Sequence, residues 1–204
     1  MNNPVRWGIL GAANFAREQM GPAIHAAKGA ELFALATSDA TKAAGFTAFA
    51  PGLRVHDTYD TLLADPDIDA VYIPLPNHLH VEWTLKALAA GKPVLTEKPI
   101  TMQSGEFDQL IAARDNSGLL AAEAFMIVHH PQWIHARDLV ADGAIGRLVR
   151  VDTTFSFDNR SETQNIRNRA DTGGGSLRDI GVYTIGSARF VTGAEMSDVR
   201  ASID

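Results

Sequence analysis

The sequence predicts an α/β protein in which an N-terminal, doubly wound parallel sheet is followed by the start of an α+β domain with a mostly antiparallel sheet. Two observations predict this fold class. Short apolar runs alternate with helix-like segments over residues 1–124, and strands at this spacing indicate βαβ units. The apolar runs are continuous rather than alternating, as is typical of parallel strands buried on both faces.

Each predicted element follows from its own signals. The strands are short apolar runs, and the helices end at glycines or at turn residues. The first helix is expected to be interrupted near Gly21 and Pro22. The predicted strands cover residues 5–10, 31–37, 69–76, 93–97 and 119–125, and the predicted helices cover residues 14–29, 39–50, 56–68, 78–92 and 104–118.

The pattern changes after residue 124, where we place a domain boundary between residues 1–124 and 125–204. A helix is expected over 130–146, and a β-branched run over 147–157 reads as one strand of an antiparallel sheet. A polar loop over 158–172 leads to a helix with a glycine-rich entrance over 172–193.

Composition narrows the class of partner. The 204 residues include 18 Lys plus Arg and 24 Asp plus Glu, so 18 − 24 gives a net charge of −6, which disfavours nucleic acid. There is no cysteine, so disulfides and thiolate metal sites are excluded. No apolar run reaches the roughly 20 residues that a membrane span requires, and no leader pattern opens the chain. We therefore expect no membrane partner and a cytoplasmic location.

The first strand is followed by a turn that matches part of a dinucleotide-binding fingerprint. That fingerprint, G-x-G-x-x-G, uses glycines to let the backbone approach a pyrophosphate. Here only Gly11 survives, although the alanines that follow are also small. An ordinary βα turn is the alternative. The candidate cofactor contacts in this turn are Gly11, Ala12, Ala13, Asn14 and Phe15.

The end of the second strand is where a cofactor ribose is usually recognised. Thr37 and Ser38 occupy that position, with Asp39 just beyond. Asp39 can accept from a 2′-hydroxyl or cap the next helix, and the cap is the commoner role. Lys42 can meet a 2′-phosphate or lie in solvent. The expected cofactor is NAD(P), with a lean to NADP.

Five motifs together resemble one enzyme family. They are "GILGAANFA" (8–16), "DAVYIPLPNHLHVEW" (69–83), "AGKPVLTEKP" (90–99), "EAFMIVHHPQW" (123–133) and "GGGSLRDIGVY" (173–183). In this order they resemble the glucose–fructose oxidoreductase/inositol dehydrogenase/MocA family of nicotinamide-dependent oxidoreductases, and the tyrosine of the last motif is similar to the xylose and dihydrodiol dehydrogenase side. The resemblance covers essentially the whole chain.

The resemblance implies roles for the residues in these motifs. Residues 1–124 would bind the dinucleotide, and residues 125–204 would begin a substrate and oligomerisation domain. Leu75, Asn77, His80 and Glu97 would lie near the cofactor, and the Lys98–Pro99 bond is expected in cis. Lys98, Asp179 and Tyr183 would be catalytic and would contact substrate.

A physical reason supports pairing Lys98 with Tyr183. A free tyrosine has a pKa of about 10, and a nearby ammonium lowers that pKa. Asp179 and Tyr183 are four residues apart, so a helix places them on one face. The alternative is a capping box formed by Ser176 and Asp179, with Tyr183 in the core. Arg167 is a candidate substrate contact or a solvated loop residue.

Seven histidines invite a metal interpretation, notably the pairs His78/His80 and His129/His130. No spacing forms a recognised ligand set, and no cysteine assists, so no metal is expected.

The predicted function is transfer of a hydride between nicotinamide and a carbinol or carbonyl carbon of a sugar, polyol or cyclic diol. The alternative is a non-catalytic nicotinamide-nucleotide sensor on the same fold, because fold alone does not fix function. Members of the resembling family continue beyond the last helix, so the chain is expected to be C-terminally truncated. The full-length protein is expected to be a homo-oligomer.

Overall fold

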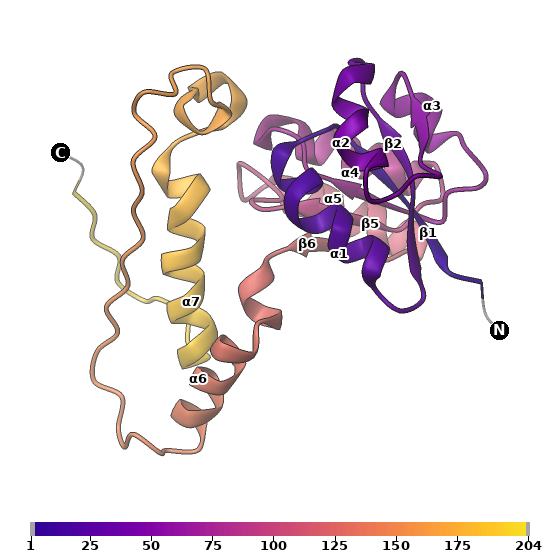
Figure 1. Ribbon diagram of the computed structural model, residues 1–204. Helices are drawn as coiled ribbons and strands as arrows, with labels where there is room; N and C mark the ends of the chain where they lie inside the picture. Colours follow the sequence, from indigo (N-terminus) through magenta and orange to yellow (C-terminus); the bar gives the residue numbers. More distant parts are fainter. Residues whose placement is uncertain (1–2, 203–204) are drawn as a thin grey trace. The chain divides into compact units, whose positions relative to one another are not determined.

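The structure is a computed structural model that describes residues 3–202. It divides into two compact units, the first ending at Ala124 and the second beginning at Phe125. Each unit is described by itself below (Figure 1).

The first unit is built on a six-stranded sheet in which every neighbouring pair is parallel. The strand order is β3-β2-β1-β4-β5-β6, so the order reverses between β1 and β4. Open α/β sheets of this kind bind ligands outside the carboxyl ends of their strands, near such a reversal. The strands are β1 (Val5–Leu10), β2 (Ala30–Ala36), β3 (Arg54–His56), β4 (Ala70–Ile73), β5 (Val94–Glu97) and β6 (Ala121–Ala124). The predicted α/β fold with a parallel sheet is confirmed.

Alternate strand residues bury themselves on opposite faces of the sheet. Leu10 belongs to one apolar cluster and Ile9 to the other. Trp83 covers the first face, while Phe46 covers the second. A doubly covered sheet explains why the central strands read as continuous apolar runs. Complete burial of one large apolar side chain contributes about 1.5–3 kcal/mol, so these two layers hold the unit together.

The helices of the first unit lie on both faces of the sheet (Figure 1). Within the described part of the chain, none of the helices is both long and apolar enough to cross a bilayer. The α-helices are α1 (Gly21–Ala26), α2 (Ala44–Thr47), α3 (Tyr59–Leu63), α4 (His80–Ala89) and α5 (Glu106–Ser117), with 3₁₀ turns at Ala40–Ala43 and Asn77–Leu79.

The interruption expected near Gly21 takes the form of a π-helical turn, Ala16–Met20, that passes directly into α1. The amide of Gly21 donates to the carbonyl of Ala16, five residues back. Pro22 has no amide hydrogen with which to continue the ladder. A Cβ at Gly21 would lie 2.7 Å from the Ala16 oxygen, so only glycine fits this wide turn.

Strand β3 is one element that the sequence analysis missed. It has three residues, two of them polar, and it pairs only with β2 at the sheet edge. Arg54 within it forms ion pairs with Asp65 and Asp67. An apolar pattern cannot reveal so short and polar a strand.

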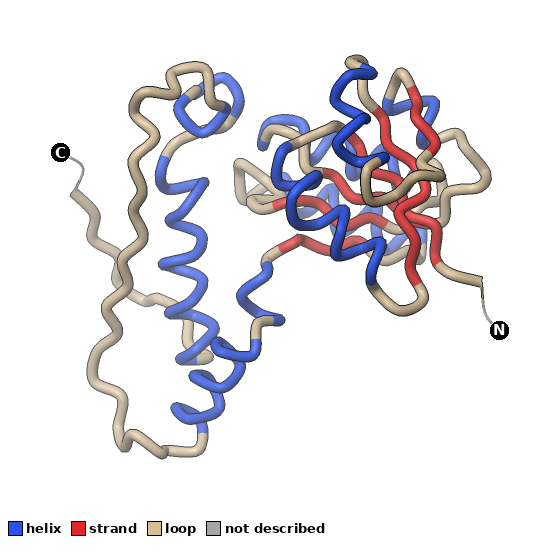
Figure 2. The backbone as a smooth tube through the Cα atoms, viewed as in Figure 1, coloured by secondary structure: helices blue, strands red, loops and turns tan. Residues whose placement is uncertain are grey.

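The second unit packs α6 (Pro131–Ala141) against α7 (Val182–Thr192). Short helical turns precede them at Met126–His129, Ile166–Asn168, Ala170–Thr172 and Leu177–Gly181. The prediction of a strand over 147–157 is wrong for this structure, because residues 125–202 contain no strand and the antiparallel sheet is absent there. Figure 2 shows residues 147–157 as an extended loop. The Thr153 hydroxyl donates a hydrogen bond to the carbonyl of Thr184 in α7. A strand needs backbone partners, and the part of the chain that the structure describes supplies no pairing strand for this segment.

The exposed stretch 149–157 carries an alternating apolar face. The exposed fractions are 78% for Val149, 40% for Val151, 46% for Phe155 and 50% for Phe157. Exposed apolar faces on extended segments favour association. We therefore expect concentration-dependent self-association that the double variant Val149→Lys/Phe157→Lys reduces, measured by sedimentation velocity.

The matched control for this prediction is Leu177→Lys, which changes another exposed apolar residue of the same unit outside the stretch. It should leave the association unchanged. A wild-type protein that sediments as a monomer at every concentration would contradict the prediction.

Candidate active site

The carboxyl ends of the parallel strands bring most of the predicted site residues of the first unit to one edge. Gly11 follows β1, Thr37 follows β2, and Leu75 follows β4. Glu97 ends β5, and Lys98 comes directly after it. This edge is where an open α/β sheet binds ligands.

The first turn depends on Gly11. Its φ of +94° lies in the region that favours glycine, and its amide donates to the Ala36 carbonyl at 2.9 Å. A Cβ there would lie 2.9 Å from Leu75 Cδ2 and 3.3 Å from the Tyr59 hydroxyl. Gly11 and Leu75, both predicted cofactor contacts, are therefore in close proximity, and Gly11 is buried.

The other predicted residues of this turn differ in exposure. Ala12 and Ala13 are half-buried, whereas Asn14 and Phe15 are exposed. The amide of Arg17 donates to the Ala13 carbonyl, so the helix begins directly at the turn. The start of a helix directly after a turn of this kind suits an anion.

The turn after β2 is organised by Asp39. Its carboxylate accepts from the amide and the hydroxyl of Thr41 at 3.0 and 2.6 Å, and these bonds hold the Asp39 pKa below its ordinary value. The cap interpretation of Asp39 is thus confirmed. Thr37 is buried, while Ser38 and Lys42 are exposed, with Lys42 on the 3₁₀ turn that Asp39 caps.

Glu97 places a carboxylate under the turn that carries Lys98. The hydroxyl of the fully buried Tyr72 donates to Glu97 Oε1 at 2.7 Å, and the Lys98 amide donates to Oε2 at 3.2 Å. Burial raises the pKa of Glu97, and these two donors and the Lys98 charge oppose that rise. The Lys98–Pro99 peptide bond is cis, as expected.

Glu123 is a site residue that the sequence analysis missed. It lies on β6, next to β5, and its Oε1 accepts from the Ile100 amide at 2.9 Å. Burial raises its pKa, and the charge of Lys98 lowers it. Lys98 therefore acts on two carboxylates. The available signal was a single carboxylate in the otherwise apolar run "LLAAEAF".

His80 is completely buried at the start of α4. Its Nδ1 lies 2.7 Å from the Pro99 carbonyl oxygen, and its Nε2 lies 2.7 Å from the Leu75 carbonyl oxygen. Burial is the main cause that lowers the pKa of His80. Asn77 begins the 3₁₀ turn that leads into the same helix.

The second unit holds the remaining predicted residues. The Arg167 guanidinium lies 3.2 Å from the Asp179 carboxylate. Asp179 is in the π-helical turn Leu177–Gly181, and Tyr183 is in the first turn of α7. The capping box is wrong, because Ser176 makes no side-chain cap bond; the π turn has shifted the local geometry.

Aromatic rings enclose Tyr183 within the second unit. Phe125 stacks on it at 5.6 Å between centroids, and Phe155 lies at 5.7 Å. Neither ring was singled out from the sequence, because both contacts join distant segments. A small pocket of about 100 Å³ lies nearby, lined by Phe157, Asn159, Arg167, Asn168, Ser176, Asp179 and Ile180.

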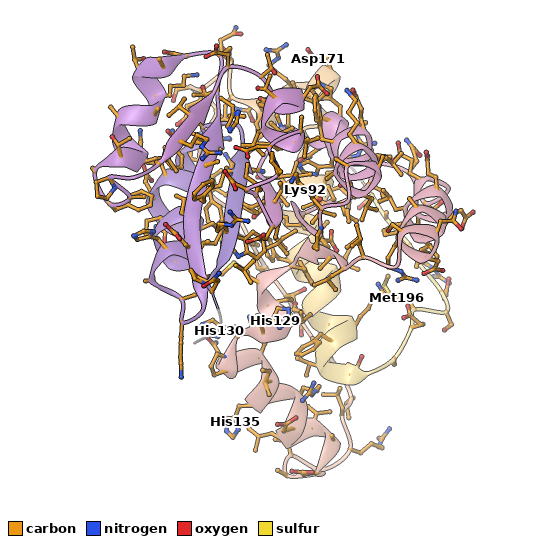
Figure 3. All side chains as sticks on the ribbon, turned by 90° about the vertical axis from the view of Figure 1, so that its right-hand side faces the viewer. Lys92, His129, His130, His135, Asp171 and Met196 are labelled. Atoms are coloured by element: carbon orange, nitrogen blue, oxygen red, sulfur yellow. The ribbon has the colours of Figure 1, made fainter. Side chains whose placement is uncertain are left out.

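The histidines of the second unit lie along the start of α6. His129 and His130 precede the helix, and His135 lies further along it (Figure 3). Among residues 3–202, no group of three or more His, Cys, Asp or Glu side chains is placed to hold a metal ion.

The sheet order and the glycine turn after β1 define an α/β fold of the Rossmann type. The chain belongs to the GFO/IDH/MocA family. Residues 5–125 match its "oxidoreductase family, NAD-binding Rossmann fold" model, and residues 133–204 match its C-terminal domain.

Similar proteins agree with this membership. An uncharacterized oxidoreductase of Rhizobium meliloti, ORF334, is 46% identical over 98% of this chain and 60% of its own length. The dTDP-3,4-didehydro-2,6-dideoxy-alpha-D-glucose 3-reductase of Actinomadura kijaniata is 40% identical over 98% of this chain and 59% of its own.

The crystal structure of KijD10, a 3-ketoreductase from Actinomadura kijaniata in complex with NADP and TDP-benzene, superposes with a TM-score of 0.81 at 38% identity. The match covers 93% of this chain and 57% of that one. The chain thus spans less than two thirds of the length of these relatives.

We expect Tyr72→Phe to destabilise the first unit by about 1–3 kcal/mol at neutral pH, because it removes a donor from a buried carboxylate. The pKa of Glu97 should rise further. A higher folded-state pKa means that the destabilisation is largest above that pKa and shrinks as the pH falls through it. Denaturant unfolding as a function of pH measures both effects.

Tyr59→Phe is the matched control. Its ring is half-buried against Trp83, and no hydrogen bond of its hydroxyl is seen among residues 3–202. Its effect should not depend on the titration of Glu97. Equal, pH-independent losses in the two variants would refute the role assigned to the Tyr72 hydroxyl.

Proposed function

We propose that the protein is an NAD(P)-dependent oxidoreductase that interconverts a carbinol and a carbonyl carbon of a sugar, polyol or cyclic diol. The observation that carries this proposal is the position of Lys98 at the carboxyl end of β5, where its charge acts on Glu97 and Glu123. Groups with shifted pKa values at the ligand-binding edge of such a sheet point to chemistry there.

The residues at this edge fit a nicotinamide dinucleotide. The tight turn at Gly11, where a Cβ would meet Leu75 and Tyr59, would place its backbone against a pyrophosphate. Thr37, Ser38 and Lys42 would contact the adenosine ribose. When bound, the nicotinamide accepts or supplies the hydride. The proposed cofactor contacts are Gly11, Ala12, Ala13, Asn14, Phe15, Thr37, Ser38, Lys42, Leu75, Asn77, Glu97 and Lys98. His80, which is also a predicted contact, has no solvent exposure and would act through the segments that it touches.

The proposed proton carrier is the hydroxyl of Tyr183. It takes the proton of the substrate hydroxyl during oxidation and returns it during reduction. The Lys98 ammonium favours the phenolate and orients the substrate oxygen. Asp179 orients this pair. Arg167, which is paired with Asp179, would meet a substrate hydroxyl or carboxylate.

The relatives support the substrate class. A dTDP-sugar 3-reductase and a 3-ketoreductase that binds NADP and TDP-benzene are both about two-fifths identical to this chain. We therefore include sugar nucleotides among the candidate substrates and place NADP ahead of NAD. The proposal also includes a homo-oligomeric full-length protein and a cytoplasmic location. The exposed apolar stretch 149–157 supports the homo-oligomer.

Lys98→Ala, Tyr183→Phe and the double variant test the catalytic roles. Loss of general acid–base catalysis lowers turnover by roughly 10²–10⁴-fold. Because the two side chains would act as a unit, the double variant should be little worse than the worse single variant. Lys98→Ala should also shift the basic limb of the pH profile upward, as the Tyr183 pKa relaxes toward about 10. Steady-state kinetics from pH 6 to 10, with NADP(H) and a panel of aldoses, inositols, cyclic diols and dTDP-sugars, measures these effects.

Lys28→Ala, which removes an exposed lysine of the same unit, is the control and should keep wild-type turnover. Near-normal turnover in either single variant would remove that residue from the mechanism. Binding of NADPH by wild type, seen by fluorescence, without turnover of any panel compound would favour a sensor over an enzyme.

Lys42→Ala tests cofactor choice. An exposed ion pair contributes up to about 1 kcal/mol, so loss of a lysine–phosphate contact should lower the NADP/NAD ratio of kcat/KM by roughly threefold to fivefold. Activity with NAD should stay unchanged, because NAD lacks the 2′-phosphate. Lys28→Ala again serves as the control, and an unchanged ratio in Lys42→Ala would exclude this lysine.

A further inference from the structure

The His80 side chain joins two segments of the first unit that are distant in sequence. Its Nε2 lies 2.7 Å from the Leu75 carbonyl oxygen, and its Nδ1 lies 2.7 Å from the Pro99 carbonyl oxygen. The ring has no solvent exposure, so no water competes for either contact. Both partners are acceptors, so the ring must be the donor.

Donor counting limits what the ring can do. A neutral imidazole carries one N–H, whereas the cation carries two. The two acceptors, each 2.7 Å from a ring nitrogen, therefore use every N–H that the ring can carry. Burial lowers the pKa of His80 below its ordinary value, and the contacts with the Pro99 and Leu75 carbonyls oppose that shift. The ring is thus held between the two segments.

The two carbonyls belong to the two segments on which the proposed site depends. Leu75 packs against Gly11 and comes two residues before Asn77. Pro99 directly follows Lys98 across a cis peptide bond. One side chain thus contacts the segment expected to hold the cofactor and the turn that carries the lysine.

We propose that His80 is a positioning residue that ties the Leu75–Asn77 segment to the Lys98–Pro99 turn and so sets the place of Lys98 relative to the bound nicotinamide. The role rests on the proposed function. It differs from direct cofactor contact, because a fully buried ring that is occupied by two carbonyls acts through the segments that it joins.

Two amide variants separate the two bonds. The Nδ2 of asparagine occupies roughly the position of imidazole Nδ1, and the Nε2 of glutamine roughly that of imidazole Nε2. His80→Asn therefore retains a donor for Pro99, and His80→Gln retains one for Leu75. His80→Phe keeps an aromatic ring and removes both donors. His25→Gln and His25→Asn, at an exposed position on α1, are the controls.

Two backbone amides report on the two segments without any turnover. The Leu79 amide donates to the Pro76 carbonyl, and the Ile100 amide donates to the Glu123 carboxylate. We expect hydrogen exchange to accelerate selectively at Ile100 in His80→Gln and at Leu79 in His80→Asn. His80→Phe should accelerate both, and the His25 controls neither.

The two amide variants should also differ in their effects on turnover and on NADPH binding. In His80→Gln the dissociation constant of NADPH should stay within about threefold of wild type, while kcat falls roughly 10–100-fold, because displacement of a catalytic group by about 1 Å costs up to 10²-fold. In His80→Asn the dissociation constant should rise roughly threefold to tenfold, as for loss of one hydrogen bond, with a smaller change in kcat.

The outcomes distinguish this role from the proposed activity. If hydrogen exchange accelerates selectively in the variants but the wild-type protein turns over none of the panel compounds, the positioning role of His80 stands and the proposed activity is refuted. Turnover by wild type with identical exchange and kinetics in the Gln and Asn variants would refute the tie alone. The positioning role would also be refuted if kcat and NADPH affinity fell together in every His80 variant, in proportion to its loss of stability.

Discussion

The hydrogen bond between Tyr72 and Glu97 is the constraint around which the carboxyl edge of the sheet is arranged. Burying a carboxylate costs free energy unless hydrogen-bond donors surround it. Proteins usually meet this cost by raising the pKa of the group or by satisfying it fully with hydrogen bonds. Here Tyr72 on β4 and the backbone amide of Lys98 both donate to Glu97. Adjacent strands are thereby fixed at the point where the lysine leaves the sheet. The direction in which Lys98 departs is a consequence of satisfying Glu97.

The same rule governs the other buried polar groups of the first unit. Thr84 and Thr96 share a buried hydroxyl contact of 2.7 Å, which joins α4 to β5. Lys92 is 6% exposed, and its ammonium donates to the Asp65 and Ile68 carbonyls. Burial lowers the pKa of Lys92, although these contacts satisfy its charge. Such groups specify one packing of α4 on the sheet, because any other packing would leave a buried donor or acceptor without a hydrogen-bond partner.

The sequence predicts what depends on local pattern and misses what depends on distant contacts. Strands β1, β2, β4, β5 and β6 are recoverable as short, mainly apolar runs, although all residues are buried only in β4 and none is buried in β6. The stretch 147–157 has the period of a strand yet pairs with no strand among residues 3–202, so pattern alone misleads. Lys98 is found through its motif. Glu123 is missed because a single exposed acid on a strand reads as an ordinary surface residue, and its bond to the Ile100 amide joins distant segments. The π turn before Gly21 is a response to Pro22 that no propensity reports.

The two units secure their proposed catalytic groups by different means. In the first unit, Lys98 follows a strand end whose hydrogen bonds are fixed by the sheet register. In the second, Tyr183 depends on ring stacking, and that stacking depends on Gly186: a Cβ there would lie 2.6 Å from Phe125. A small residue on α7 is thus as necessary to the position of Tyr183 as the sheet register is to the position of Lys98.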